Sequence, residues 1–276
     1  MTAAVRILVV AALGGLLAVP VHAGWREDVA ELKAGPFSPP PDGLTVRYTF
    51  GWEGISAAGA DVRLGRGADG VWTGVVRGGT TGAARALWRL DADYDTKLAA
   101  DGWRSLGATL TEKYRRYRVE EKMEFPVGGV RSWRESTRKG SSAPQWKNFY
   151  ITGIRDMAGA LLLARSQPLK NGDRLSLAVF PGDWMYLVRV KVEGREKLRW
   201  RGEQRSVIRL SLAIDRINDD YSLSPHKKFQ SGTIWVSDDE VRMPLRIEVK
   251  VFVGSVFAEL VEVNTPRLPG VRVSSE

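Results

Sequence analysis

The sequence predicts a mainly β fold: a large curved antiparallel sheet or open barrel, with one helix packed on its concave face. Two observations support this prediction. From Leu44 almost to the end of the chain apolar and polar residues alternate, and one segment has the spacing of a helix. Alternation buries one face of each strand and leaves the other in water, as in antiparallel sheets. The alternating runs amount to roughly a dozen strands, as in a sandwich, barrel or curved sheet.

The strands with the strictest alternation are predicted around the middle of the chain and in its second half. They cover residues 117–125, 184–192, 208–215 and 245–251. In the last of these strands the residues expected to face the core are Leu245, Ile247, Val249 and Val251. Short turns separate the strands, among them Gly128-Gly129 and Asn171-Gly172-Asp173.

The one predicted helix covers residues 154–167. Its apolar residues recur three or four positions apart, and Pro168 ends the segment. The apolar stripe contains Ile154, Met157, Ala158, Leu161 and Leu162. Such a stripe has to be buried against another element. We therefore expect the helix to lie across the concave face of the sheet or in the mouth of a half-barrel.

The N-terminus has the features of a signal peptide. Arg6 is followed by an apolar stretch from Ile7 to Val19 and by Val21-His22-Ala23, a small-residue cleavage pattern. A retained anchor is the alternative, but a membrane span needs about 20 apolar residues. We expect cleavage near Ala23 and a periplasmic or secreted protein.

Patterning and composition together divide the chain into four segments. We predict a signal peptide over 1–23, a charged lead with a proline-rich linker over 24–43, a single β-rich domain over 44–266 and a C-terminal tail over 267–276.

The composition excludes several classes of function. The chain has no cysteine, which rules out disulfides, thiol catalysis, Cys-ligated zinc and iron–sulfur clusters. Of its two histidines, cleavage would remove His22 and leave His226 alone. A metal site with two histidines from one mature chain is then impossible, and we expect neither a metal nor a cofactor.

The net charge is positive. It is formally +9, and loss of Arg6 with the signal peptide lowers it to +8. An exported basic protein favours anionic partners such as phospholipid headgroups or acidic glycans, and peripheral contact with a membrane. Nucleic acid is not expected in that compartment. The alternative is a basic protein without a charge-driven partner, and the oligomeric state is left open.

Three adjacent carboxylates, Asp238, Asp239 and Glu240, stand between two alternating runs. Glycosidases need two carboxyl groups a defined distance apart, which adjacent residues do not provide. Aspartates in turns hydrogen-bond to the backbone nearby. We therefore predict the tip of a hairpin at this position, not an acid–base site.

Asp91, Asp93 and Asp95 have the alternate spacing with which a calcium-binding loop begins. Thr96 and Gly102, however, stand where that loop needs its glycine and its glutamate. The same spacing in a strand places three acids on one wet face, which is the interpretation we favour.

Three other polar segments also lack the additional residues or motifs that a catalytic or binding site requires. The oxygen-rich residues 215–220 are typical of a loop between strands. His226 follows a proline, and no Gly-x-Ser-x-Gly motif accompanies it. The glycine-rich turn 78–82 has no predicted helix after it, so it is not expected to form a phosphate-binding loop.

Ten tryptophans are the most unusual feature of the composition, and many of them stand beside basic residues. These are Trp88, Trp103, Trp133, Trp146 and Trp200. Such pairs can stack on sugars or lie at a lipid interface, whereas the alternative is aromatic packing along the rims of the sheet. The densest basic–aromatic stretch, residues 113–118, is the expected anion-facing surface.

Residues 232–248, with the sequence GTIWVSDDEVRMPLRIE, resemble the C-terminal signature of domain of unknown function 3108, a family of exported bacterial proteins. Other similar segments are 44–59, 156–165, 168–173, 192–196, 253–255 and 259–260. The resemblance implies a single exported β-rich domain. It implies no activity and no catalytic residues.

These observations favour an exported, non-catalytic protein that binds an amphipathic or anionic ligand of the envelope, a lipid or a lipid-linked glycan. The predicted ligand-binding residues are Met157, Leu161, Leu162, Arg115, Arg116, Arg118, Trp184 and Tyr186. One alternative is an envelope interaction module for an acidic glycan or a partner protein. The other is a polysaccharide hydrolase or lyase, which needs two acids distant in sequence to meet in a cleft.

Overall fold

The computed structural model describes residues 24–37, 39–226, 229–251 and 254–264. The predicted signal peptide and C-terminal tail lie outside the described residues. The fold is mainly β, as predicted, and consists of one large antiparallel sheet of 15 strands that stays open. The prediction of a single helix is wrong, because the described residues form three short helices.

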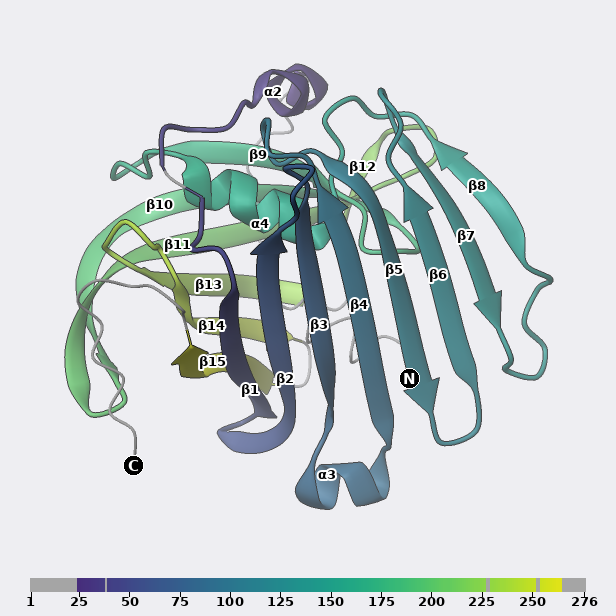
Figure 1. Ribbon diagram of the computed structural model, residues 1–276, viewed down its shortest axis with the longest axis horizontal. Helices are drawn as coiled ribbons and strands as arrows, with labels where there is room; N and C mark the ends of the chain where they lie inside the picture. The colour runs from purple at the N-terminus through teal and green to yellow at the C-terminus, as the bar shows by residue number, and fades with distance from the viewer. Residues whose placement is uncertain (1–23, 38, 227–228, 252–253, 265–276) are drawn as a thin grey trace.

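The pairing order divides the sheet into two wings that meet where β1 pairs with β15 (Figure 1). The N-terminal wing follows sequence order: β1 (Leu44–Trp52), β2 (Ile55–Arg66), β3 (Trp72–Thr80), β4 (Leu90–Leu98), β5 (Ser105–Tyr114), β6 (Arg118–Glu124), β7 (Val130–Ser136) and β8 (Gln145–Phe149). The C-terminal wing continues with β15 (Gly254–Asn264), β14 (Pro244–Val251), β13 (Phe229–Ser237), β11 (Glu203–Ile217), β10 (Met185–Trp200) and β9 (Arg174–Val179). The short β12 (Leu223–Pro225) pairs with β11. Strands β8 and β9 are therefore the two ends of the pairing order.

Two of the three helices lie in connections between strands, and the first precedes β1. The helices are α2 (Trp25–Glu31), α3 (Gly82–Leu87) and α4 (Met157–Ser166). Helix α4 lies inside the predicted segment 154–167, whereas α3 begins at the glycine turn after which no helix was expected. The sequence does not signal α3, because none of its residues is buried and it has no apolar stripe.

The largest core cluster contains side chains from α4 and from both wings. Leu162 and Leu163 of α4 are buried in the same cluster as Trp72 and Leu98 of the N-terminal wing and Val190 of the C-terminal wing. Burial of each such leucine side chain contributes about 1.5–3 kcal/mol. A helix of ten residues is not stable alone in water, so this packing holds α4 in place.

The N-terminal end of α4 is held by a buried carboxylate. Asp156 is the N-cap of the helix, and its Oδ1 accepts a hydrogen bond of 2.8 Å from the Gly159 N–H. Its two oxygens also accept hydrogen bonds from the hydroxyls of Tyr94 (2.7 Å), Thr96 and Ser105 (2.6 Å). A carboxylate without solvent contact needs such donors, because an unpaired buried charge is strongly destabilising. Asp156 thereby fixes α4 to β4 and to the first residue of β5.

The C-terminal end of α4 is held by an arginine of the β13–β14 hairpin. The Arg242 guanidinium donates hydrogen bonds to the carbonyl oxygens of Arg165 (3.1 Å), Gln167 and Pro168 (2.8 Å). It also stacks on the Phe37 ring, 3.2 Å from the ring centroid. The last carbonyls of a helix have no partners within the helix, and a cation is favourable there.

A second core cluster brings the segment before β10 against the far end of the N-terminal wing. Phe180 is fully buried in this cluster with Met123 of β6 and Val130 of β7. Its ring centroid is 5.1 Å from that of Phe149 in β8. Residues 180–184 consequently face the strands β6 to β8.

Candidate functional site

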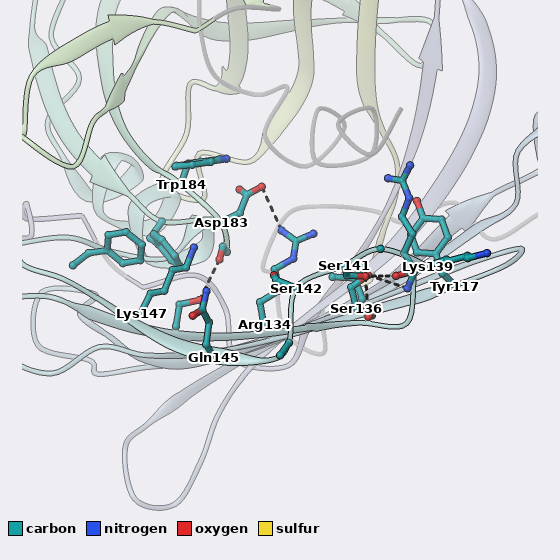
Figure 2. Close-up of a pocket in the computed structure, with 18 residues that line it drawn as sticks. Tyr117, Arg134, Ser136, Lys139, Ser141, Ser142, Gln145, Lys147, Asp183 and Trp184 are labelled. Atoms are coloured by element: carbon teal, nitrogen blue, oxygen red, sulfur yellow. Dashed lines mark hydrogen bonds and ion pairs between the residues drawn. The ribbon is translucent and has the colours of Figure 1, made fainter.

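A pocket of about 510 Å³ lies between strands β6 to β8 and residues 182–184 (Figure 2). Its lining is dominated by polar groups and aromatic rings. The cations are Arg134, Arg138, Lys139 and Lys147; the acid is Asp183; the other polar side chains are Ser132, Ser136, Ser141, Ser142 and Gln145; and the rings belong to Tyr117, Phe149, Phe180 and Trp184. Four cations against one acid make the lining positively charged.

The polar lining follows from the period-two geometry of β7 and β8. Ser132, Arg134 and Ser136 alternate along β7 and therefore point to the same face. In β8, Gln145 pairs with Arg134 and Lys147 pairs with Ser132, so these side chains lie on that face too. Strand pairing thus places a row of donors along one wall of the pocket.

Arg134 lies between two carboxylates that are distant in sequence. Its Nη1 atom is 3.2 Å from Oε1 of Glu121, the residue directly opposite on β6, and 3.7 Å from Oδ2 of Asp183. The Glu121 side chain is fully buried, whereas those of Asp183 and Arg134 are 24% and 37% exposed. Figure 2 shows Arg134 and Asp183 directed toward each other across the pocket. Glu121 anchors the guanidinium, and the accessible part of Arg134 faces the pocket.

Gly182 brings the segment that carries Asp183 and Trp184 close to this pair. It has a φ of +134°, and a Cβ atom at this position would lie 1.8 Å from Oε2 of Glu121. The hydroxyl of Ser132 donates a hydrogen bond of 3.2 Å to the Gly182 carbonyl oxygen. Only glycine adopts this conformation readily, and only glycine leaves room for the Glu121 carboxylate.

Trp184 forms the opposite wall and remains 38% exposed. The Arg216 guanidinium lies 3.5 Å from its ring centroid, in a cation–π contact that holds the indole in place. A fixed, half-exposed indole beside hydroxyl and guanidinium donors can stack against an apolar ring face.

The structure brings one predicted ligand-binding residue to this pocket, Trp184. Tyr186, the second residue of β10, instead places its ring 5.5 Å from that of His226. Arg115 and Arg116 lie in the exposed β5–β6 turn, and Arg118 begins β6 beside Tyr117, which lines the pocket.

The predicted helix residues lie away from the pocket lining. Leu162 is buried in the main core cluster, and Met157 is packed between the two largest clusters. Leu161 is 45% exposed.

Sequence reasoning missed Arg134, Lys147 and Asp183. A signal for Arg134 was present, since two serines flank it at alternate positions in a strand where an apolar inner face is expected. Asp183 had no such signal, because it reaches the pocket only through tertiary packing.

The structure agrees with the hairpin prediction for Asp238 to Glu240. Strands β13 and β14 flank them, and Asp239 Oδ1 accepts hydrogen bonds from the backbone N–H groups of Val241 (3.0 Å) and Arg242 (2.9 Å). Asp239 therefore stabilises the turn, as aspartates at turn positions do. The hairpin is also hydrogen-bonded to α4, because the Arg165 guanidinium donates a hydrogen bond of 2.6 Å to the Val241 carbonyl oxygen.

The acidic cluster on β4 is neutralised by neighbouring cations. Asp91, Asp93 and Asp95 lie on β4, where Arg85 and Arg77 pair with the first and last of them at 2.6 and 2.8 Å. Among the residues that the structure describes, no group of three or more His, Cys, Asp or Glu side chains is placed to hold a metal ion.

Within the described part of the chain, none of the helices has the length and apolar character that a membrane span requires.

Comparisons with known proteins agree with the fold. Residues 45–261 match the family described as "Protein of unknown function (DUF3108)". The crystal structure of a β-barrel-like protein of domain of unknown function DUF1849 from Brucella abortus is similar, with a TM-score of 0.56 and 11% identity over 82% of this chain and 98% of that chain. At that identity the likeness concerns the fold alone. MucB in complex with MucA(peri) aligns at 13% identity over 88% of this chain and 93% of that one, with a TM-score of 0.15 that supports no statement. No curated protein matches the sequence.

Proposed function

This chain belongs to the DUF3108 family of proteins of unknown function, and from its pocket we propose that it is an exported protein that binds an anionic glycan of the cell envelope. The sugar part of a lipid-linked glycan is the ligand class that fits best. The observation that carries the proposal is the pocket of about 510 Å³, with four cations, one acid, a row of hydroxyl groups and Trp184.

The size and chemistry of the pocket support a ligand of one or two sugar rings with an acidic group. Binding pockets for small ligands have volumes of about 300–1,000 Å³. The Arg134 guanidinium can bind a carboxylate or phosphate through two parallel hydrogen bonds, and Lys147 adds a second positive charge. Serine hydroxyls and the Gln145 amide suit sugar hydroxyls, while the Trp184 indole suits the apolar face of a sugar ring.

The carboxylates of the pocket favour binding over hydrolysis. A glycosidase needs two carboxyl groups that both reach the sugar. Glu121 is fully buried behind Arg134, so Asp183 is the one acid that lines the pocket among the described residues. The fold therefore supports a binding role better than the alternative of a hydrolase.

We also propose that α4 covers the concave face of the sheet. Its buried leucines share one cluster with both wings, which supports this placement. Side chains then fill the space in which a lipid tail would have to lie. The ligand consequently binds beside β6 to β8, through its polar part.

Isothermal titration calorimetry with purified protein tests the binding proposal. The probes are short oligouronates from alginate, with neutral malto-oligosaccharides of equal length as the comparison. Arg134→Ala and Lys147→Ala should each weaken oligouronate binding about ten-fold or more, because a hydrogen bond to a charged group contributes about 1.5–3 kcal/mol.

Arg131→Ala is the matched control for these variants. Arg131 belongs to the same strand as Arg134 but points to the opposite face, where it stacks on Trp146 at 4.3 Å. It should bind like the wild type. Equal affinity for neutral and acidic oligomers, or unchanged affinity in a folded Lys147→Ala variant, contradicts the proposal.

Export has its own test. Expression with fractionation of a Gram-negative host, followed by mass spectrometry of the intact protein, should place a chain that starts near Gly24 in the periplasm. A full-length chain that stays in the cytoplasm would refute this part of the proposal.

A further inference from the structure

One end of the N-terminal wing carries three apolar side chains with unusual exposure. Trp52 and Ile55 flank the β1–β2 turn and are 48% and 68% exposed, and Leu87 at the end of α3 is 86% exposed. Large apolar side chains are mostly buried in soluble domains, and groups of exposed ones mark contact surfaces.

The segments that carry these side chains are adjacent in space. The Thr81 N–H, just before α3, donates a hydrogen bond of 2.9 Å to the Ala57 carbonyl oxygen of β2. Arg115, in the β5–β6 turn, donates one of 2.6 Å to the Ala86 carbonyl oxygen of α3. Figure 1 shows the β1–β2 turn and α3 at the same end of the wing. We call this surface the basic–apolar rim; it consists of Trp52, Ile55, Leu87, Arg89, Arg115 and Arg116.

Exposed cations lie on the same segments as the apolar side chains. Arg89, Arg115 and Arg116 are exposed, and Arg85 of α3 is partly exposed. Two acids lie beside them: the exposed Glu53 of the β1–β2 turn accepts a hydrogen bond from the Ser255 N–H, and Asp91 pairs with Arg85 at 2.6 Å and with Arg89 at 3.5 Å. Four arginines against these two carboxylates leave this end of the wing with a net positive charge beside its apolar tips.

We infer that the basic–apolar rim docks the protein on the surface of an anionic lipid bilayer. Tryptophan prefers the headgroup level, aliphatic side chains on turns can enter the acyl boundary, and arginines bind anionic headgroups. A protein partner fits the rim less well. Even the largest aromatic side chain buries about 250 Å², so three apolar side chains fall short of the about 800 Å² that each partner contributes to a stable complex.

The inferred orientation links the rim to the pocket. Tyr117, which lines the pocket, belongs to the same turn as Arg115 and Arg116. Docking through the rim would hold the pocket beside the headgroup layer. The inference does not depend on the proposed ligand, because it rests on a different set of side chains.

Co-sedimentation with vesicles tests the inference. Purified protein is mixed with vesicles of equal parts phosphatidylglycerol and phosphatidylcholine, or of phosphatidylcholine alone. The wild type should bind the anionic vesicles, and the double variant Ile55→Asp, Leu87→Asp should bind them about ten-fold less tightly or worse. The matched control is Val127→Asp: Val127 is 94% exposed but lies at the opposite end of β6, and this variant should bind like the wild type.

A label provides a second readout that does not depend on affinity. The chain has no cysteine, so Ile55→Cys offers a unique position for an environment-sensitive fluorophore. Its emission should shift to shorter wavelength when anionic vesicles are added, whereas the same label at Val127→Cys should not respond.

Three results with vesicles would each overturn the inference: the wild type fails to bind the anionic vesicles, the rim variant binds as tightly as the wild type, or the labels at positions 55 and 127 respond alike. Sedimentation velocity without lipid tests whether the rim binds a second copy of the protein. If the wild type is a dimer and the rim double variant is a monomer, the rim is a self-association surface and the membrane inference is wrong.

Discussion

Glu121 and Arg134 lie directly opposite each other on β6 and β7, with 3.2 Å between Glu121 Oε1 and Arg134 Nη1. The glutamate is fully buried, and the arginine is 37% exposed. The buried Glu121 carboxylate therefore orients the Arg134 guanidinium, and the accessible guanidinium is the group that can bind a ligand. Loss of Glu121 should therefore affect both the stability of the protein and the affinity of the pocket.

Gly182→Ala should destabilise the protein by more than about 1 kcal/mol. The new Cβ would lie 1.8 Å from Oε2 of Glu121, at a φ of +134° that alanine adopts only with strain. Urea denaturation followed by circular dichroism measures the free energy of unfolding. The double variant Gly182→Ala, Glu121→Ala removes the clash, so its loss should be smaller than the sum of the two single losses. Simple additivity would show that Glu121 does not restrict this position.

Asp183→Asn should strengthen the binding of an acidic ligand several-fold. Asp183 is the acid that lines the pocket, and its Oδ2 lies 3.7 Å from Arg134 Nη1, where it competes for the guanidinium. Titration calorimetry with the oligouronate probes measures the change in affinity. Asp215→Asn, which removes an acid paired with Arg189 elsewhere on the sheet, should leave the affinity unchanged. Weaker binding in Asp183→Asn would mean that this carboxylate contacts the ligand.

The sequence predicted the strands well because their inner faces are apolar. Val249 and Leu245 are buried as their alternation indicates. Glu121 stands on the same inner face as Met123, and alternation cannot reveal that a buried carboxylate is paired there. The helix begins at Met157 and not at Ile154, because the side chain of Asp156 caps it and Ile154 is buried before the first turn.

The site was harder to predict than the sheet because it joins segments from both sides of α4. Arg134 and Lys147 come from β7 and β8, while Asp183 and Trp184 follow β9. Local patterns describe each segment, but not the packing of Phe180 that brings them together. The choice between an open sheet and a barrel was equally non-local, since it depends on whether the two end strands meet.

Asp156→Ala should destabilise the protein by about 3 kcal/mol or more. The carboxylate caps α4 and accepts hydrogen bonds from three hydroxyl groups and one backbone N–H, all without solvent. Alanine would leave buried donors unpaired, each at a cost of about 1–3 kcal/mol. Urea denaturation provides the measurement. The exposed turn residue Asp220 is a suitable control, because its carboxylate accepts hydrogen bonds from the nearby Ser222. Asp220→Ala should therefore lower the free energy of unfolding by less than Asp156→Ala. Equal losses at the two positions would contradict the role given to Asp156.

The stability of the protein should fall as the pH rises above about 10. Burial, and then the negative charge of Asp156, raise the pKa of Tyr94 well above the usual tyrosine value, and burial raises the pKa of Tyr48 as well. Unfolded tyrosines release their protons near pH 10, so the folded state holds more protons above that pH and loses stability as the pH rises. The contribution of Arg165 to this pH dependence has the opposite sign, because burial and the nearby Arg242 lower its pKa to about 10. Above that pH the folded state holds fewer protons on Arg165 than the unfolded state does, so this group favours folding as the pH rises.

Denaturation at several alkaline pH values, together with tyrosinate absorbance, tests this prediction. Tyr48 and Tyr94 should ionise only when the chain unfolds. Tyr94→Phe should reduce the dependence on pH, and it should lower stability at neutral pH by about 1–2 kcal/mol through loss of the bond to Asp156. If all seven tyrosines ionise in the folded protein, the buried environment of Tyr94 and Tyr48 is wrong.

Arg242→Lys should destabilise the protein by about 1–3 kcal/mol although it keeps the charge. The guanidinium bonds to the carbonyl oxygens of Arg165, Gln167 and Pro168 at once, and its plane stacks on the Phe37 ring. A lysine ammonium cannot reproduce this planar set of contacts. Thermal and urea denaturation measure the loss, with Arg246→Lys on the exposed side of β14 as the matched control.

The turn of the β13–β14 hairpin and the end of α4 are coupled through Arg242. Asp239 fixes the turn through the backbone N–H of Arg242, which sets that residue at a φ of +48° and aims its side chain at the end of α4. Asp239→Ala should therefore lose stability through the same contacts as Arg242→Lys. The losses of the double variant should be clearly less than additive. Full additivity would mean that the turn and the helix end are held independently.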